Sequence, residues 1–428
     1  MGAKSRQRIA GRALLGARLG LCVLIFMAAQ SAPTAASAEP LPQVSGGTMA
    51  APSDLAEVLS ELPSFRALDA QREDVRLQIF ITEVPNAEDV STWRSAGYRV
   101  GEEYLYPASA IKHLAAMAVF ARHPELRPQD LVSIYEAPSP ALTPEELASF
   151  QGRRARQQTL EEIVRDALIT SGNDAYNRLV DIVGHQALNE WLRDAGLVTS
   201  KLRHRMFAFA PNAVQRMSPR VEVRRDGRVL LRLPARRSAF EFSALVPARA
   251  MVGDAYIDED SGARVDRAMD FSEKNDVPIA DLHRAMMMFA FPAASAEALG
   301  LPVGARGLGL SAQARAFLIA VMSEHPQGRA DRGFEVRADR YKPLLPGLRR
   351  VLPVERIDYV NKAGRAYGFH VESAWLRDRV TGRALVVTAG LYVNSDGVVN
   401  DNRYDYHRSY AFFADLGEWV GQRLLEAR

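Results

Sequence analysis

Apolar and polar positions along the 428-residue chain predict a helical middle between two groups of strands. After Pro107, apolar residues recur every three to four positions, which predicts an amphipathic helix that begins near Ala108 and ends before Pro124. Thr159 and Glu162 have the spacing of a capping box and predict a second helix that ends near residue 170. The same periodicity predicts further helices over residues 53–68, 175–183, 186–195, 279–289, 311–323 and 410–425.

The strands are predicted by alternation. Apolar and polar residues alternate from Val75 to Ile81, which is typical of a strand, and residues 221–231 are predicted to form a hairpin around Asp226-Gly227. Other strands are predicted over residues 98–106, 356–361, 371–377 and 383–392. Because two strands precede the helices and three follow them, we expect one sheet built from both chain ends. The predicted fold class is α/β (α+β), with a mostly helical lobe inserted in the sheet.

The first 38 residues have the features of a secretory signal peptide. They carry five positive charges and no acid, and an apolar core over 19–29 precedes Ala36-Ser37-Ala38. The apolar core is too short to remain as a membrane-spanning anchor. We therefore expect a periplasmic or secreted protein, cleaved before Glu39, with a linker over 39–52 and no stable membrane anchor after cleavage.

Charge and cysteine content exclude several classes of function. Residues 39–428 carry 49 Lys and Arg against 51 Asp and Glu, and the basic residues are scattered, so no nucleic-acid partner is expected. The only cysteine, Cys22, lies in the predicted signal peptide, which leaves the exported chain without disulfides. The eight histidines show no metal-ligand spacing, and we expect neither a metal nor a cofactor.

Ser109 and Lys112 are the first candidates for chemistry. Ser109 falls in the first turn of the predicted helix, where free N–H groups and the helix dipole favour a developing anion. Lys112 lies three residues further on, on the same helix face. A serine needs a base to take its proton, and a buried lysine with a lowered pKa can be that base. Only six of the 54 Lys and Arg residues of the chain are lysines. This scarcity favours a role for Lys112 that arginine cannot perform.

Two further motifs follow. Ser171-Gly172-Asn173 comes 62 residues after Ser109, and a hydroxyl and a carboxamide on a turn can pass a proton and hold a substrate amide. Lys362-Ala363-Gly364 is expected to end a strand. At this position Gly364 would let a substrate backbone approach closely, and Lys362 would place a positive charge beside it. Each motif alone is also typical of an ordinary turn or strand end.

Together, in this order and spacing, the three motifs resemble those of the serine penicillin-recognising enzymes, and class A β-lactamases most closely. The resemblance covers about residues 70–428. It implies a β-lactamase/transpeptidase-like fold, with an antiparallel sheet flanked by helices, in a single catalytic domain over 53–428. An α/β lobe would comprise about 53–107 and 351–428, and a helical lobe about 108–350, with the hairpin near 221–233.

The resemblance also implies roles for individual residues. Ser109 would be the acylated nucleophile, and Lys112 would be its base or proton relay. Ser171 would pass a proton to the leaving nitrogen, and Asn173 would hold the side-chain amide of the substrate. Lys362 would support the electrostatics of the site.

Arg365 completes the implied site, because its backbone N–H and that of Ser109 would form the oxyanion hole. Three departures from the family pattern are visible. Gly172 stands where class A has aspartate, and Ala363 stands where the family has a hydroxyl that helps to bind the substrate carboxylate. The loop over 200–207 contains no acid, although class A carries there the glutamate that activates water for deacylation.

We therefore expect a serine hydrolase that acts by acyl transfer through Ser109, on β-lactams first, with slow deacylation. A peptidoglycan D-alanyl peptidase or an esterase on the same fold is one alternative, and a non-catalytic ligand-binding relative is another. In each case the expected partner is a small-molecule or peptidoglycan-derived amide. The acids over 254–260 are expected in a solvated loop.

Overall fold

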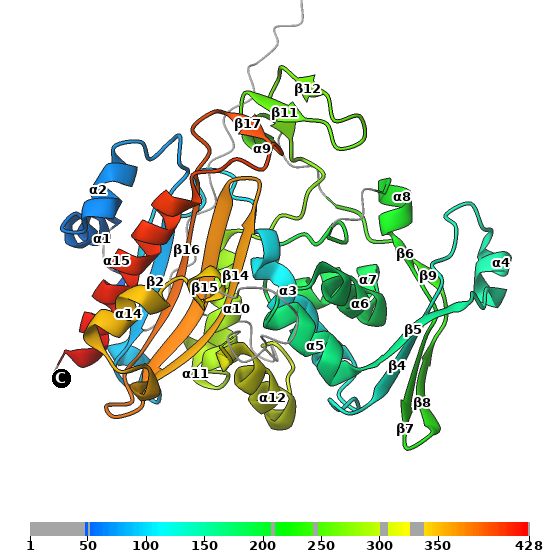
Figure 1. Cartoon of the computed structure of the whole chain (residues 1–428). Helices are drawn as coiled ribbons and strands as arrows, with labels where there is room; N and C mark the ends of the chain where they lie inside the picture. The colour runs from blue at the N-terminus through cyan, green and yellow to red at the C-terminus, as the bar shows by residue number, and fades with distance from the viewer. Residues whose placement is uncertain are drawn as a thin grey trace, which may run out of the picture. The chain divides into compact units, whose positions relative to one another are not determined.

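A six-stranded sheet built from both ends of the chain lies at the centre of the structure (Figure 1). The strand order is β1-β3-β2-β16-β15-β14, and all neighbours are antiparallel except β1 and β3. Its strands are β1 (Thr48–Met49), β2 (Gln78–Val84), β3 (Arg94–Tyr98), β14 (Ile357–Ala366), β15 (Phe369–Asp378) and β16 (Ala384–Tyr392). Every residue of β16 is buried, which explains why its sequence is almost continuously apolar.

The computed structural model of the protein describes residues 48–49, 52–206, 210–242, 247–299, 307–325 and 338–426. Contacts within the chain divide it into two units, Met1–Glu39 and Pro40–Arg428, and every described residue belongs to the second unit. The predicted signal peptide and most of the predicted linker lie outside the described residues.

Helices cover both faces of the sheet and form two separate apolar cores. The first face carries α1 (Pro52–Leu59), α2 (Pro63–Asp69), α14 (Leu345–Val351) and α15 (Tyr406–Leu425), and the second carries α10 (Ile279–Ala290) and α12 (Ala312–Ser323) (Figure 1). The side chains of β2 alternate between the two cores. Ile79 and Ile81 belong to the core on the first face, and Phe80 belongs to the core on the second face.

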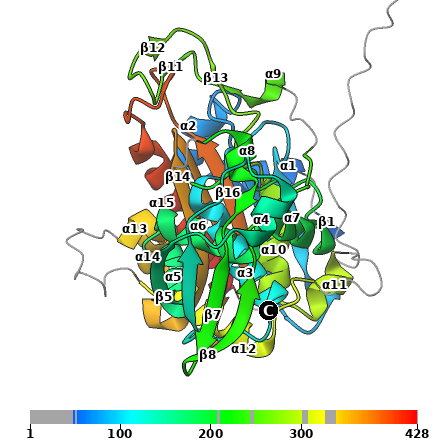
Figure 2. The same ribbon diagram turned by 90° about the vertical axis from the view of Figure 1, so that its right-hand side faces the viewer.

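The segment between β3 and β14 contains a second group of helices and a second sheet (Figure 2). The helices are α3 (Lys112–Arg122), α5 (Leu160–Leu168), α6 (Asn173–Val183) and α7 (His185–Asp194). The four-stranded sheet has the order β5-β4-β7-β8, from β4 (Leu131–Tyr135), β5 (Arg154–Thr159), β7 (Val221–Arg225) and β8 (Arg228–Leu233). The predicted fold class is confirmed, with the correction that the hairpin is half of a larger sheet.

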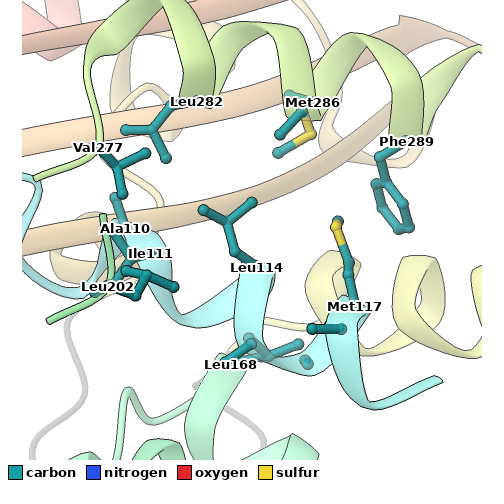
Figure 3. Close-up of a cluster of buried hydrophobic side chains, with 14 of the residues drawn as sticks. Ala110, Ile111, Leu114, Met117, Leu168, Leu202, Val277, Leu282, Met286 and Phe289 are labelled. Carbon is teal, nitrogen blue, oxygen red and sulfur yellow. The ribbon is translucent and has the colours of Figure 1, made fainter. Parts of the chain in front are cut away.

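The central helix α3 is buried on every side from Lys112 to Phe120, so the helix predicted there is confirmed but its amphipathic character is not (Figure 3). Leu114 and Met117 lie between α10, represented by Leu282 and Met286, and the end of α5 at Leu168. This packing fixes the positions of the residues on the first turn of α3.

Several predicted elements need correction, and two of them only shift: β2 begins at Gln78 instead of Val75, and α15 begins at Tyr406 instead of residue 410. The helix over 53–68 is two helices, α1 and α2, because Pro63 cannot continue a helix and disfavours helical backbone at the residue before it. The strand over 98–106 is wrong, because β3 ends at Tyr98 and the chain turns through positive φ angles at Arg99 and Gly101. The strand over 356–361 continues to Ala366, so the third motif lies inside β14 instead of ending it.

The remaining elements are short. They are the helices η1 (Val90–Thr92), α4 (Pro144–Ser149), α8 (Asn212–Gln215), α9 (Pro247–Ala250), α11 (Ala294–Ala298), α13 (Ala338–Tyr341) and η4 (Val354–Arg356), and the strands β6 (Met217–Ser218), β9 (Arg236–Arg237), β10 (Met251–Val252), β11 (Ala255–Ile257), β12 (Arg264–Val265), β13 (Met269–Asp270) and β17 (Val398–Val399). Within the described part of the chain, no helix is both long and apolar enough to cross a membrane.

Candidate active site

Ser109 lies half-buried at the start of the central helix. Its turn is a 3₁₀ helix, η2 (Ala108–Ile111), that leads directly into α3. Ala108 has a φ of 47°, in the left-handed region that residues with a side chain rarely adopt. Such strain persists only where the surrounding structure holds it, and it clusters at functional sites. The closely packed α3 provides that support for Ser109.

The Lys112 amine is the centre of a buried hydrogen-bond cluster. None of the side chain is exposed, and Nζ lies 2.5 Å from Ser171 O, 2.6 Å from Asn173 Oδ1 and 3.3 Å from Ser171 Oγ. The two carbonyl oxygens only accept hydrogen bonds, so they engage two N–H groups. The three contacts match the three N–H groups of an ammonium, whereas a neutral amine would donate to the two carbonyl oxygens and accept from the Ser171 hydroxyl.

Burial and neighbouring charges set the protonation of this amine. Burial lowers the pKa of Lys112 well below its ordinary value, and the Lys362 ammonium lowers it further. The Asp166 carboxylate acts in the opposite direction. The two dominant effects favour the neutral amine, which is the form that a general base needs.

Lys362 approaches the same serine from the sheet. Its Nζ lies 3.1 Å from Ser171 Oγ and 2.7 Å from Ala363 O. The Ser171 hydroxyl therefore lies between two lysine amines, on a residue whose own φ of 60° is left-handed. Burial lowers the pKa of Lys362 to about 7, although the Glu372 carboxylate opposes this effect. A hydroxyl in this position can pass a proton between the groups that flank it.

Gly364 allows β14 to contact the turn that carries Ser109. A Cβ atom at Gly364 would lie 2.4 Å from Ala110 N, 2.6 Å from Pro107 O and 2.6 Å from Ser109 N. All three are backbone atoms and cannot rotate away. The sequence predicted that this glycine admits a substrate backbone, and the structure adds that it admits the nucleophile's own turn.

Arg365 borders the cleft, but its guanidinium points to the other side of the sheet. Nη1 donates a hydrogen bond to Tyr410 OH, and the guanidinium lies 4.7 Å from the centre of the Tyr406 ring. Both tyrosines belong to α15. The part of Arg365 that the site can use is therefore its backbone.

A buried network of polar side chains supports β14 from behind. Lys342 Nζ donates hydrogen bonds to Met322 O (2.9 Å), Tyr359 O (3.0 Å) and Asn361 Oδ1 (2.8 Å). Asn361 Nδ2 and Tyr359 OH in turn donate to Glu372 Oε1, at 2.8 and 2.7 Å. Burial lowers the pKa of Lys342 and raises the pKa of Glu372. Sequence reasoning missed this network, although the scarcity of lysine marked Lys342.

A cleft of about 440 Å³ joins these groups. Its lining includes Ser109, Ser171, Asn173, Glu273, Lys274 and residues 204–206 and 363–366. The structure thus brings every predicted site residue to one place, except that Lys112 and Lys362 lie just beneath the wall. Among the described residues, no group of three or more His, Cys, Asp or Glu side chains could hold a metal ion.

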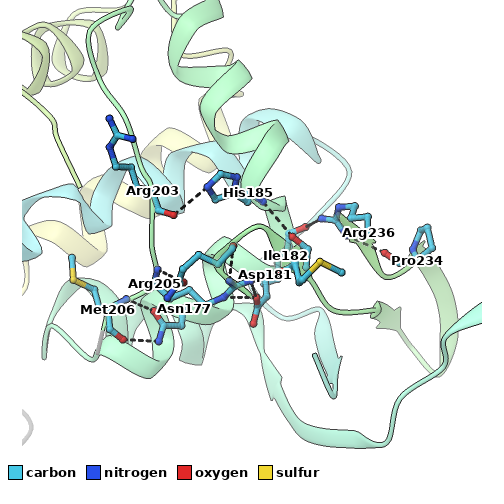
Figure 4. Close-up of polar contacts among 12 residues, drawn as sticks. Asn177, Asp181, Ile182, His185, Arg203, Arg205, Met206, Pro234 and Arg236 are labelled. Atoms are coloured by element: carbon cyan, nitrogen blue, oxygen red, sulfur yellow. Dashed lines mark hydrogen bonds and ion pairs between the residues drawn. The ribbon is translucent and has the colours of Figure 1, made fainter. Parts of the chain in front are cut away.

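The loop over 203–206 is held against α6 and α7 (Figure 4). Arg205 Nη2 lies 2.6 Å from Asp181 Oδ1, and the Met206 backbone exchanges two hydrogen bonds with the Asn177 side chain, at 2.7 and 2.9 Å. His185 Nε2 lies 3.2 Å from Arg203 O. This well-anchored loop is the one in which the family glutamate is missing.

The lining of the cleft contains two acid–base groups, His204 and Glu273, that could be considered as a replacement. His204 Nδ1 donates to Arg205 O (2.7 Å), and His204 Nε2 accepts from the Asn275 N–H (3.2 Å), so both ring nitrogens are engaged. Burial lowers the pKa of His204 to about 4, which keeps the ring neutral. Glu273, which sequence reasoning missed, is the one carboxylate among the described lining residues, and its Oε2 accepts a hydrogen bond from Asn212 Nδ2.

The acids over 254–260 do not line the cleft. Glu259 comes nearest through a neighbour, because Tyr367 OH donates a hydrogen bond to Glu259 Oε1 (2.9 Å) and Tyr367 is a lining residue. Lys274, another of the six lysines, lies 5.3 Å from the centre of the Tyr367 ring. A cation and an aromatic ring thus form one corner of the cleft.

Comparison with known proteins agrees with the motifs and the fold. Residues 66–233 match the model of the beta-lactamase enzyme family, a segment that includes the first and second motifs and ends before the third. Comparison with curated proteins gives no match. This match confirms the resemblance to β-lactamase-like serine hydrolases that the three short motifs predicted.

Solved structures of the same kind align over most of the chain. A β-lactamase from Desulfarculus baarsii DSM 2075 is 18% identical, with 86% of this chain and 98% of that chain covered and a TM-score of 0.46. A β-lactamase from Xanthomonas campestris pv. campestris is 18% identical, with 86% and 96% covered and a TM-score of 0.45. A mutant of PBP-A, solved as an acyl-enzyme complex with penicillin G, is 14% identical, with 87% and 97% covered and a TM-score of 0.45.

Proposed function

We propose that the protein is a serine hydrolase that acts by acyl transfer through Ser109. The observation that carries this proposal is the meeting of two buried amines, Lys112 and Lys362, at the Ser171 hydroxyl, which lines the same cleft as Ser109. A buried lysine beside a serine at a helix start has the features of an activated nucleophile. The matched family and the fold support the same class of reaction.

In the proposed first step, Ser109 Oγ attacks the carbonyl carbon of an amide while Lys112 Nζ takes the hydroxyl proton. The backbone N–H groups of Ser109 and Arg365 stabilise the negative charge that grows on the carbonyl oxygen. The C–N bond then breaks, and the leaving nitrogen receives a proton through Ser171. The product is an ester between the acyl group and Ser109, with the amine still attached when the substrate is cyclic.

We propose β-lactams as the first substrate class to test. Asn173 would hold the side-chain amide of such a substrate, and Lys362 would attract its carboxylate. Ala363 provides no hydroxyl for that carboxylate, and the buried Glu372 lies directly opposite Ala363 in the sheet register. Binding of the carboxylate should therefore be weak, so high concentrations are needed in every assay.

Deacylation should be the slower step. A water molecule must attack the ester, and a positioned general base typically contributes about 10²–10⁴-fold to such a step. The loop over 203–206 carries no acid, and both nitrogens of His204 are engaged. We expect a burst of one product equivalent per enzyme with a chromogenic cephalosporin, followed by turnover slowed by about 10²–10⁴-fold relative to an efficient β-lactamase.

Stopped-flow measurement of this burst tests the proposal, with Ser109→Ala as the control that should show none. Fast linear turnover without a burst would contradict slow deacylation and would make Glu273 the first base to examine. Glu273→Gln would then slow turnover without changing the acylation rate.

Intact mass after incubation with a penicillin separates the alternatives. A stable adduct on Ser109 supports acylation with slow release. A peptidoglycan D-alanyl peptidase that a β-lactam inhibits would give the same adduct. Release of the smaller peptide product from a D-alanyl-D-alanine peptide would distinguish that peptidase. If penicillins, esters and peptides give neither an adduct nor turnover, the remaining alternative is a non-catalytic ligand-binding protein.

A further inference from the structure

A carboxylate from another element occupies the space next to Gly172, where class A enzymes carry an aspartate. A Cβ atom at Gly172 would lie 2.9 Å from Cγ, Oδ1 and Oδ2 of Asp166 on α5. The backbone angles of Gly172, φ −58° and ψ 127°, are ordinary for any residue. The backbone therefore does not require glycine at this position, whereas the Asp166 carboxylate, where it lies, leaves no room for a Cβ atom.

Asp166 is also bound to the turn that carries Ser171. Its backbone oxygen accepts hydrogen bonds from Gly172 N (2.9 Å) and Thr170 Oγ1 (2.8 Å), and its Oδ1 accepts from Thr170 Oγ1 at 2.5 Å. Residues on both sides of Ser171 are thus tied to one aspartate. Because Ser171 has a left-handed φ, its turn needs such support to keep its shape.

Asp166 faces the proposed base as well. The groups around the Lys112 amine are Ser171 and Asn173 from the α5–α6 turn, Lys362 from β14 and Asp166 from α5. The Lys362 ammonium and the Asp166 carboxylate shift the pKa of Lys112 in opposite directions. Asp166 is therefore the carboxylate that opposes the effect of Lys362 on the Lys112 amine.

We propose that Asp166 is a positioning residue of this site, and that it supplies from α5 the carboxylate that Gly172 leaves out. It holds the Ser171 turn in place and balances the charge at Lys112. This inference deepens the proposed function, because it assigns a role at the same acylation site.

The first test removes the charge and keeps the shape. In Asp166→Asn, Lys112 should titrate at lower pH than in the wild type, and the acid limb of the acylation rate should move in the same direction. With only six lysines, ¹³C-lysine NMR can follow Lys112 directly, assigned through Lys112→Arg. Asp174→Asn is the matched control, since that carboxylate pairs with Arg156 and Arg178 at 3.0 Å. An unchanged Lys112 titration in Asp166→Asn would overturn the proposal.

The second test exchanges the two positions. Gly172→Asp alone should displace either the Asp166 carboxylate or the Ser171 turn, and a misplacement of about 1 Å can lower a rate by about 100-fold. The double variant Asp166→Ala/Gly172→Asp should recover most of that loss in both acylation rate and unfolding midpoint. A double variant that shows the sum of the two single losses would contradict the exchange.

Failure of the proposed function would be recognised separately. If the wild type forms no adduct with benzylpenicillin, acylation by β-lactams is wrong. The Lys112 titration and the unfolding midpoints of the exchange series need no turnover, so they still decide whether Asp166 acts as proposed.

Discussion

At the scale of single residues, the site depends on the chemical difference between lysine and arginine. Four of the six lysines, Lys112, Lys274, Lys342 and Lys362, line the cleft or lie beneath its wall. The chain uses arginine for most other positive charges. Arginine keeps its proton at every accessible pH, so it cannot replace a base.

We predict that Lys112→Arg loses acylation as completely as Lys112→Ala. The larger guanidinium keeps a positive charge where the mechanism needs a neutral lone pair. The rate constant for labelling by a fluorescent penicillin would measure this. Lys201→Arg is the control, because Lys201 lies outside the cleft lining and should label normally. Equal labelling of Lys112→Arg and wild type would show that Lys112 is not the base.

A second prediction concerns pH. If Lys362 acts as an ammonium, the acylation rate should fall as pH rises through about 7, where burial places the pKa of Lys362. In Glu372→Gln the carboxylate that raises this pKa is absent, so the alkaline limb should move to lower pH. The Lys112 and Lys342 amines face the same region, and the pKa of Lys342 should fall as well, because the Glu372 carboxylate also raises it. Asp358→Asn, at an ion pair with Arg379 on the exposed end of β14, should leave the pH profile unchanged.

At the scale of elements, the site is a contact between a strand and a helix start. β14 is the edge strand of the sheet, and its Gly364 lies directly against the turn of Ser109. Lys362 from the strand and Lys112 from the helix meet at Ser171, which belongs to neither element. The catalytic geometry therefore depends on how closely β14 and η2 approach.

We predict that Gly364→Ala destabilises the protein by roughly 1–3 kcal/mol, as overpacking of a close contact typically does. It should also lower acylation strongly, because the new Cβ pushes β14 away from backbone atoms of η2. Thermal unfolding and penicillin labelling would measure the two effects. Gly97→Ala on β3 is the matched control, since its Cβ would meet only a Val100 methyl at 3.3 Å. Full labelling of Gly364→Ala would show that this contact is not needed.

At the scale of the whole molecule, both ends of the chain form the sheet and the segment between them supplies the rest of the site. Ser109 and Lys362 are 253 positions apart in sequence, yet each forms hydrogen bonds or contacts at the same cleft. The predicted exported chain contains no cysteine, so its two apolar cores must stabilise this arrangement alone.

We predict that the exported protein begins at Glu39 and unfolds at the same temperature with and without a thiol reductant. N-terminal sequencing of protein recovered from the periplasm or medium would check the first statement, and calorimetry would check the second. An exported chain that still begins at Met1 or contains Cys22 would contradict cleavage before Glu39.

Several features were determined by the sequence alone because they depend on local spacing. The helices at 112–122, 160–168 and 173–183 follow from periodicity and capping residues within a few positions. The three motifs, their order and the scarcity of lysine were visible without coordinates. They were enough to predict the fold class and seven of the residues that line or underlie the cleft.

Only the tertiary structure decided which distant residues meet. β4 pairs with β7, the first strand of a hairpin about 90 positions later, a contact that no local pattern encodes. Glu372 and Lys342 form a network across two elements, and Asp166 fills the space at Gly172 from the preceding helix. In each case the function of a side chain depends on its neighbours in space, because burial, charge and steric exclusion act over a few ångströms regardless of distance along the chain.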